Sequence, residues 1–190
     1  MAAPGPNPEN ILQTAIAAVH QGGDQLLRAL DELPAPIYVT NADGIVTHYN
    51  RACIAFAGRT PRVGGDSWCV TWKLYTDQGQ FLPHDQCPMA VAIRERRTIR
   101  GCGAVAERPD GTRVKFMPYP TPLLDDDGDL VGAVNLLLEI NDRQQVQTLL
   151  AQAARCRRLA GSVSDRQTMA VLTAMAAEYD EKALTLEQVN

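Results

Sequence analysis

Three β-type runs in the second half of the chain, joined by two turn sequences, constrain the fold most strongly. The runs are Ile99 to Glu107, Thr112 to Leu124 and Leu130 to Glu139. Between them stand Arg-Pro-Asp-Gly and Asp-Asp-Asp-Gly, in which Asp and Gly favour tight chain reversals. Since such short turns join antiparallel neighbours, these residues predict three consecutive antiparallel strands.

A second β-type region precedes these strands and adds a hairpin. Ile37 to Thr40 and Ile45 to Tyr49 are β-branched or aromatic runs on either side of the turn sequence Asn-Ala-Asp-Gly. Between the two β regions, apolar periodicity predicts a short helix over Arg51 to Gly58 and a longer one over Asp85 to Arg97. Two strands, helices and three strands predict an α+β fold with a five-stranded antiparallel sheet.

Prolines place further limits on these elements. Three prolines between Met1 and Asn10 argue against a regular helix and predict a frayed tail. Pro88 fits its helix only in the first turn, where its missing N–H costs nothing. Pro118, Pro120 and Pro122 do not suit a central strand, so they predict a bulged or edge-like end to the fourth strand.

Helical patterns flank the strands at both ends. From Ile11 to Leu33, apolar residues recur every three or four positions, which predicts two helical pieces. Gln144 to Leu159 and Asp165 to Leu184 show the same pattern and predict a C-terminal helical hairpin. Ser164 and Gln167 have the spacing of a capping box at the start of its second helix.

Composition excludes several classes of protein. The chain has 190 residues, of which 45% are hydrophobic, enough for one core with additional helices. A formal net charge of -4 argues against charge-driven binding to nucleic acid or to an anionic membrane. No apolar run approaches the roughly 18 residues of a membrane span, and the N-terminus lacks the features of a signal peptide. We therefore expect a cytoplasmic protein with neither a membrane nor a nucleic-acid partner.

The cysteines form no recognisable disulfide or metal-binding pattern. They are odd in number and scattered, with no CxxC or CxxCH spacing, which argues against a disulfide scaffold, a zinc ribbon and attached c-type haem. One interpretation is that they are small buried hydrophobes. The alternative is a four-thiolate site built from the first four, although their spacing matches no compact cluster motif. The five are Cys53, Cys69, Cys87, Cys102 and Cys156.

The segment from Leu30 to Ala52 resembles the opening of a PAS (Per-Arnt-Sim) sensor domain. In that family a proline-ended helix leads into a hairpin, and an Asn, here Asn50, starts the first core helix. The family commonly ends its last strand with Asp-Ile-Thr, whereas this chain has Glu139-Ile140-Asn141; Asn141 or Asp142 can still cap the following helix. Later segments are similar too: Gly79 to Met89, Arg108 to Gly111, Asp127 to Val134 and Glu139 to Arg143.

The resemblance implies a specific domain organisation and fold. It covers residues 26–143 as the PAS domain, preceded by a tail and N-terminal dimerisation helix in residues 1–25 and followed by a helical hairpin in residues 144–190. The implied fold is a five-stranded antiparallel sheet with helices on one face, plus the N-terminal helix and the hairpin. The resemblance also implies a small-molecule pocket between sheet and helices, and flanking helices that serve dimerisation and signal output.

Six residues are candidates for contact with a ligand in this pocket. His84 precedes the helix that carries the iron ligand in haem-binding relatives, so it could ligate iron, with the neighbouring Asp85 as a hydrogen-bond partner; the alternative is a helix cap or turn residue. Trp68 and Trp72 could stack on a planar ligand, or they could simply pack in the core. The other three candidates, chosen for their places on a pocket helix or on sheet strands, are Met89, Phe116 and Asn135.

These observations predict a sensory module that binds a small molecule and relays the signal through flanking helices in a homodimer. Alternatives are a haem-binding gas or redox sensor and a ligand-free adaptor that docks on a kinase or regulator. The cofactor is unknown. The Gly-x-Asn-Cys-Arg-Phe-Leu-Gln stretch of the flavin-binding light sensors does not occur. We expect no enzymatic activity, since no nucleophile elbow, phosphate loop or HExxH motif is present.

Overall fold

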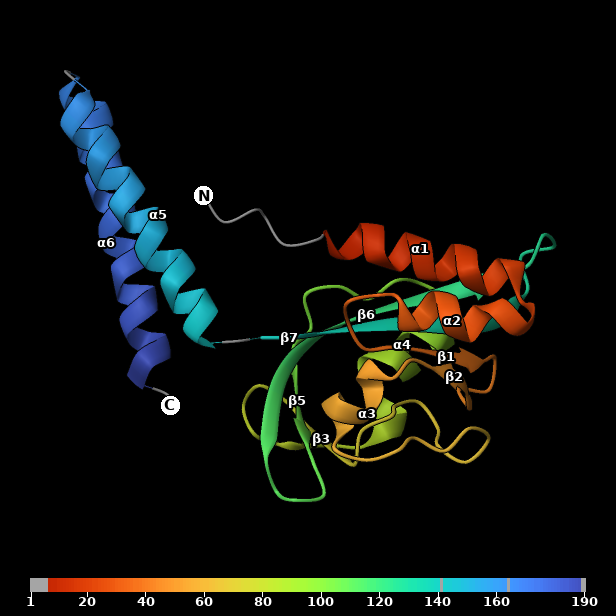
Figure 1. Cartoon of the computed structure of the whole chain (residues 1–190). Helices are drawn as coiled ribbons and strands as arrows, with labels where there is room; N and C mark the ends of the chain where they lie inside the picture. Colours follow the sequence, from red (N-terminus) through yellow and green to blue (C-terminus); the bar gives the residue numbers. More distant parts are fainter. Residues whose placement is uncertain (1–6, 141, 164, 189–190) are drawn as a thin grey trace. The chain divides into compact units, whose positions relative to one another are not determined.

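An antiparallel sheet organises the first of two compact units, Met1–Glu139. The computed structural model describes residues 7–140, 142–163 and 165–188. The strands in these ranges are β1 (Ile37–Asn41), β2 (Val46–Tyr49), β3 (Lys73–Tyr75), β4 (Phe81–Leu82), β5 (Ala104–Glu107), β6 (Arg113–Leu124) and β7 (Leu130–Glu139). They form one seven-stranded sheet in the order β2-β1-β7-β6-β5-β3-β4 (Figure 1).

The sheet is larger than the five strands that the sequence predicts. β3 and β4 are the additional strands, with 3 and 2 residues. A period of two residues cannot be recognised in runs of this length. β3 is held by pairing with β5, from Lys73 opposite Glu107 to Tyr75 opposite Val105. Lys73 and Glu107 also form an ion pair, with 3.3 Å between Nζ and Oε1. Long-range pairing, rather than local sequence, therefore makes this edge of the sheet.

The prolines of β6 mark an open edge, as the sequence predicts. β5 pairs with β6 only from Arg113 to Phe116. On its other side β6 pairs with β7 from Phe116 to Leu124. Beyond Phe116, one side of β6 thus has no strand partner in the described chain, and a missing proline N–H costs no ladder hydrogen bond there. β5 itself begins at Ala104, five residues later than predicted.

The helices of this unit follow the predicted order. They are α1 (Pro8–Gln21), the 3-10 turn η1 (Gly23–Gln25), α2 (Leu26–Asp31), α3 (Ala52–Ala57), the 3-10 turn η2 (His84–Gln86) and α4 (Pro88–Glu95). The expected frayed tail up to Asn10 is wrong for the described part. The side chain of Asn7 accepts a hydrogen bond from the N–H of Glu9 at 3.0 Å, and Pro8 stands in the first turn of α1. A capping Asn followed by Pro favours a helix start here.

Helices cover both faces of the sheet, because alternate residues of β1 and β7 point to opposite sides. Tyr38 and Leu137 belong to the core shared with α3 and α4. Ile37, Val39 and Leu136 belong to a second core that includes α1 and α2. Figure 1 shows the two helix pairs on opposite sides of the strands. The N-terminal helices therefore occupy a face of the sheet that the prediction left uncovered, and the apolar side of α1 is buried within its own chain.

Asn50 ties three segments of this unit together. Its Oδ1 accepts the N–H of Ile37 at 3.0 Å, which fixes the start of β1. Its Nδ2 donates to the carbonyl of Leu30 at 3.0 Å and to that of Ala35 at 2.8 Å. The Asn side chain, 1% exposed, thereby pairs with backbone groups at the end of α2, in the following turn and at the start of β1.

The second unit, Ile140–Asn190, is the predicted helical hairpin of α5 (Asp142–Ser162) and α6 (Arg166–Gln188). Ala153, Cys156 and Ala176 form its buried contact. Ser164 and Asn141, named above as capping residues, lie outside the described residues; Asp165 accepts the N–H of Thr168 at 2.7 Å. No helix in the described ranges combines the length and apolar character needed to cross a bilayer.

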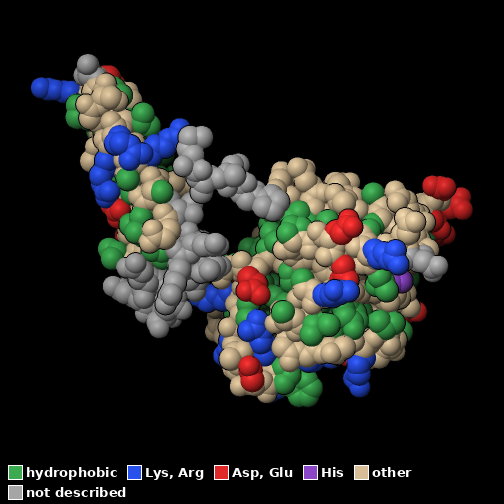
Figure 2. Space-filling model, in the orientation of Figure 1, with side chains coloured by type: hydrophobic (Ala, Val, Ile, Leu, Met, Phe, Trp, Pro, Cys, Tyr) green, Lys and Arg blue, Asp and Glu red, His purple; other side chains and the backbone are tan. Residues whose placement is uncertain are grey.

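On the face of the first unit drawn in Figure 2, charged side chains of both signs are interspersed, apart from an acidic group at the tip of the β6–β7 hairpin. That group is the Asp-rich turn, which closes on itself. Oδ1 of Asp125 accepts the N–H of Asp127 at 3.1 Å and the N–H of Asp129 at 2.8 Å. The turn thus uses its first carboxylate to reverse the chain.

We expect Asn50→Ala to lower the free energy of unfolding by about 3 kcal/mol, because it leaves buried backbone groups without partners. Urea unfolding followed by circular dichroism measures the change. Asn10→Ala is the matched control: Asn10 is exposed on α1, and we expect a change within about 0.5 kcal/mol. Equal unfolding midpoints for the two variants would contradict the role given to Asn50.

Candidate functional site

A surface cleft of about 480 Å³ opens on the first unit, beside η2. Its walls come from residues 59–72, which follow α3, and from residues 84–85 at the start of η2. Three of the six predicted ligand-contact residues, Trp68, Trp72 and His84, line it. The structure thus brings together residues from two separate parts of the sequence, in a concave site of the size that holds a small molecule.

Trp68 is held in an unusual backbone conformation at the cleft wall. Its φ of 67° is in the left-handed region, which costs a non-glycine residue about 1 kcal/mol. The N–H of Trp68 donates to the carbonyl of Gly44 at 2.7 Å. The indole ring lies against Gly44, where a Cβ atom would overlap it. Gly44, at the predicted β1–β2 turn, therefore both makes the turn and leaves room for the ring.

Trp72 is the more accessible of the two indoles. It is 53% exposed, a large fraction for such an apolar side chain. An exposed indole in a concave site offers a face for stacking on a planar ligand. Trp72 is thus a surface residue, whereas Trp68 packs partly against the core.

His84 is linked to the protein interior by a short polar chain. Its Nε2 lies 3.3 Å from the hydroxyl of Thr71, which in turn lies 3.2 Å from the Sγ of Cys69. Burial, followed by the positive charge of Arg59, lowers the pKa of His84 below its ordinary value of 6.5. The carboxylates of Asp66 and Asp85 each oppose this by less than Arg59 contributes. The imidazole is therefore neutral at neutral pH.

Arg59 and Asp66 form a largely buried ion pair in the cleft wall. Arg59 Nη2 lies 2.7 Å from Asp66 Oδ2, and the side chains are 18% and 7% exposed. Arg59 Nη2 also donates to the carbonyl of Thr71 at 3.2 Å. Burial raises the pKa of Asp66, but hydrogen bonds from the Arg62 N–H and from Arg59 outweigh it, so that the pKa lies below its ordinary value. The carboxylate is therefore ionised and fixes the guanidinium in place.

Met89 and Phe116 lie in the core rather than in the cleft. They are 1% and 2% exposed in the cluster between the sheet and helices α3 and α4. Phe116 meets Phe56 edge-to-face, with 5.1 Å between ring centroids. Burial raises the pKa of the core thiols Cys53 and Cys87 to about 12, so both are protonated. Core side chains, including Met89 and Phe116, therefore fill this part of the space where the family resemblance implies a ligand pocket.

Asn135 connects the core to the cleft through Tyr38. Asn135 Nδ2 donates to the Tyr38 hydroxyl at 2.9 Å, and that hydroxyl donates to the carbonyl of Trp68 at 2.8 Å. Burial, and next the thiols of Cys69 and Cys87, raise the pKa of Tyr38 well above its usual range. The neutral phenol therefore remains a hydrogen-bond donor to the cleft wall.

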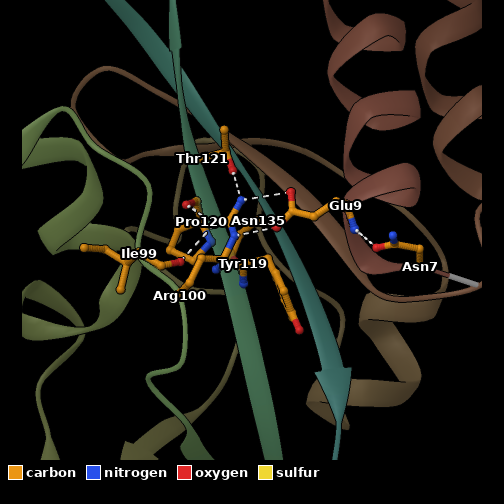
Figure 3. Close-up of polar contacts among 8 residues, drawn as sticks. All are labelled: Asn7, Glu9, Ile99, Arg100, Tyr119, Pro120, Thr121 and Asn135. Atoms are coloured by element: carbon orange, nitrogen blue, oxygen red, sulfur yellow. Dashed lines mark hydrogen bonds and ion pairs between the residues drawn. The ribbon is translucent and has the colours of Figure 1, made fainter.

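The same Asn135 continues the network toward helix α1 (Figure 3). Its Oδ1 accepts the N–H of Tyr119 at 3.0 Å. The guanidinium of Arg100 lies 5.3 Å from the centre of the Tyr119 ring and forms an ion pair with Glu9 of α1, with 2.8 Å between Nε and Oε1. Arg100 also donates to the carbonyl of Pro120 at 3.0 Å. Hydrogen bonds, the contact of Arg100 with the Tyr119 ring and the ion pair with Glu9 therefore connect the cleft wall to helix α1.

Sequence patterns did not single out Tyr38, Arg59, Asp66 and Thr71 as members of this site. Tyr38 stands in the predicted β1 run and Asn135 on β7, where they face each other by register. The pairing of Tyr38 with Asn135 can be predicted only when the order of the strands in the sheet is known. Arg59, Asp66 and Thr71 lie in an irregular loop, and no local pattern shows that they meet.

The donor set does not fit a haem ligated by His84. The Nε2 nitrogen faces the hydroxyl of buried Thr71. Binding iron through that nitrogen would require breaking this contact and turning the ring. Among the described residues, no three His, Cys, Asp or Glu side chains gather in a way that could hold a metal ion.

The first unit is an α+β domain whose antiparallel sheet carries helices on both faces. A family model described as the PAS fold matches residues 30–145, more than half of the chain. The chain therefore belongs to the PAS fold family. A comparison with curated proteins finds none that matches it.

Solved structures similar to this chain include light-oxygen-voltage (LOV) and other PAS domains. The Rhodobacter sphaeroides LOV protein has 13% identity and a TM-score of 0.47, covering 96% of this chain and 99% of its own. A LOV domain from a blue-light activated histidine kinase of Erythrobacter litoralis has 19% identity, a TM-score of 0.44, and covers 58% and 99%. The PAS domain of the fruit-fly ELK potassium channel has 12% identity, a TM-score of 0.46, and covers 62% and 95%. None of these similarities bears on a ligand.

We expect Gly44→Ala to destabilise the protein by about 2 kcal/mol more than Gly128→Ala. Both glycines have positive φ, +79° and +84°, so both variants bear backbone strain. Only at Gly44 would the new methyl group overlap the Trp68 ring, because nothing lies within 4 Å of that position at Gly128. Urea unfolding gives the difference, and Trp fluorescence shows whether the ring has moved. Equal losses of stability would show that the ring adapts without cost.

We expect the stability of the protein to fall as the pH drops through about 6.5, in part because of His84. Its pKa is lower in the folded protein than in the unfolded chain, so the unfolded chain binds more protons between the two values. The free energy of unfolding therefore rises with pH across that window. His84→Gln should reduce this pH dependence, whereas His20→Gln, at an exposed position of α1, should not. Urea unfolding at several pH values makes the comparison.

Proposed function

We propose that this chain is a non-enzymatic sensory module that binds a small molecule in the cleft beside Trp68, Trp72 and His84. One observation carries the proposal: the cleft wall at Trp68 is hydrogen-bonded to Tyr38, which leads through Asn135 toward a flanking helix. A site with accessible aromatic and charged groups is thereby connected to an element that can transmit a change.

The composition of the cleft supports ligand binding over a purely structural role. A protein gains little stability from leaving Trp72 half exposed, whereas a ligand ring stacked on it would remove apolar surface from water. Trp68 keeps a strained backbone, and such strain is concentrated at ligand sites and switches. The pair Arg59 and Asp66 adds fixed polar groups that can orient a ligand.

A ligand acts on the relay only if it binds two arrangements of the cleft with different affinity. Contact with Trp68 changes the position of the carbonyl that accepts the Tyr38 hydroxyl. The change reaches Tyr119 through Asn135, and then the ion pair of Arg100 with Glu9 that holds α1. Release or tightening of α1 is then the output of the module.

Dimerisation and partner binding belong to the same proposal. The apolar side of α1 is already buried in its own chain, so we assign the homodimer contact to the α5–α6 hairpin. Exposed apolar side chains on that hairpin support the assignment, and a downstream kinase or regulator could use the same surface. These side chains are Leu150, Leu159, Met169, Val171, Met175 and Leu184. Cytoplasmic location remains part of the proposal.

The proposal is tested by thermal unfolding with three matched probes: phenylacetate, phenylacetamide and phenethylamine. At ten times its dissociation constant, a probe that binds the folded state stabilises it by about 1.4 kcal/mol. We expect at least one probe to raise the Tm of the wild-type protein. Sedimentation equilibrium of the same samples reports whether the chain is a dimer.

Trp72→Ala should abolish the rise in Tm, because it removes the exposed stacking surface. Phe81→Ala is the matched control, since Phe81 is also exposed (61%) but is not a cleft residue. If all three probes leave the wild-type Tm unchanged, the cleft is not a small-molecule site. The filled core around Met89 and Phe116 would then favour the alternative, a ligand-free adaptor that acts through its surfaces.

A further inference from the structure

We infer that the ligand of this cleft is a planar organic anion, such as an aromatic carboxylate, held by guanidinium groups at one end and by indole rings at the other. The inference rests on the proposed function and names the chemical class of its ligand. It follows from how the charges of the cleft are distributed and from which of its hydrogen-bonding groups are already engaged.

Two guanidinium groups share one carboxylate in the cleft wall. Asp66 Oδ2 accepts from Arg59 Nη2 at 2.7 Å and from the backbone N–H of Arg62 at 2.9 Å, while its Oδ1 lies 3.4 Å from Arg62 Nε. The buried carboxylate balances only one of the two positive charges. These three side chains together carry a net charge of plus one, which the exposed Asp85 balances when the whole lining of the cleft is counted.

Several guanidinium donors remain open to a ligand. The Arg59 contacts to Asp66 and Thr71 both use Nη2, which leaves Nη1 without a hydrogen bond among the described residues; Nε is also unpaired, but it is buried and out of a ligand's reach. The side chain of Arg62 is 75% exposed and uses Nε for its ion pair. Guanidinium groups recognise carboxylates through paired N–H donors, so this arrangement suits a carboxylate oxygen.

The Arg59 guanidinium is also held in a fixed position before a ligand binds. Its bonds to Asp66 and to the carbonyl of Thr71 restrict its position, so less conformational entropy is lost when a ligand binds. His84 is neutral and therefore does not change the charge of the cleft. Asp85 is the one carboxylate of the cleft without an ion pair in the described chain; it is exposed at η2, where solvent screens it.

The apolar end of the ligand is defined by the tryptophans. Trp68 and Trp72 are the two tryptophans of the chain, and both line the cleft. Flat apolar surface beside a positive charge is matched by a ring that carries a carboxylate. Because both tryptophans of the chain line the cleft, all indole emission of the protein comes from this site, and intrinsic fluorescence reports on it specifically.

The test is a fluorescence titration of the full chain with the three probes named above, which share a ring and differ in charge. We expect phenylacetate to bind about tenfold more tightly than phenylacetamide, because the amide loses the charge-assisted hydrogen bonds. Phenethylamine should bind more weakly still. Saturating phenylacetate should also raise the pKa of His84 in a proton NMR titration, while His20 and His48 serve as internal references.

Variants of the charged residues test whether their charge and donors, rather than the folded structure alone, determine the affinity for phenylacetate. Arg62→Gln removes a largely exposed side chain and should weaken phenylacetate binding about threefold or more, without a comparable effect on phenylacetamide. Arg59→Lys keeps the charge that pairs with Asp66 but loses the forked donors, and it should weaken phenylacetate further. Asp85→Asn should strengthen it. Arg113→Gln is the control, because Arg113 pairs with Glu107 on β5, away from the cleft residues.

The outcomes distinguish the two proposals. If phenylacetamide or phenethylamine binds as tightly as phenylacetate, the cleft is a ligand site but not an anion site, and this inference is wrong. If phenylacetate binds with an unchanged affinity to both Arg62→Gln and Arg59→Lys, the guanidinium groups are not its partners. This inference is then also wrong. If no probe binds, the proposed function fails and the inference fails with it.

Discussion

The phenol of Tyr38 is the interaction on which the rest of this structure depends. It is fully buried, and a buried hydroxyl must be paired or cost a few kcal/mol. Asn135 and the carbonyl of Trp68 supply its two partners. The bond to Asn135 joins the side chains of a residue pair in the β1–β7 ladder, and the bond to Trp68 holds the cleft wall against the sheet. Because burial keeps the phenol neutral, this arrangement persists over the whole physiological pH range.

Much of the fold could be predicted because its main elements carry local signals. The β1–β2 hairpin, the turns before β6 and β7, and the helices α1 to α6 each show a periodicity or a turn sequence of their own. β3 and β4 do not, since they exist only through pairing with β5 and with each other. The packing position of α1 could not be predicted from the sequence either. Its apolar stripe shows that one side must be covered, but not whether a second chain or its own sheet covers it.

The candidate site was predicted in part, for a different reason. Trp68, Trp72 and His84 were found because aromatic and imidazole groups are rare and stand out in the sequence. Met89 and Phe116 were chosen for a pocket between sheet and helices, where the structure has packed core. Arg59 and Asp66 were missed because an ion pair across an irregular loop leaves no periodic trace. The polar half of the site therefore depends on tertiary structure, while the aromatic half is visible in the sequence.

The proposed signalling has one physical requirement. A small ligand that gains one or two kcal/mol by closing the cleft can shift a conformational equilibrium only if the competing arrangements differ by a similar amount. The strained φ of Trp68 and the partly exposed ion pair of Arg100 with Glu9 both fall in that range, about 1 kcal/mol each. By contrast, the Asn50 hydrogen bonds and the two apolar cores are far stronger. In the relay that we propose, the weak links therefore lie at the two ends of the Tyr38–Asn135 connection, and a change at the cleft would reach α1 while the stronger interactions keep the sheet folded.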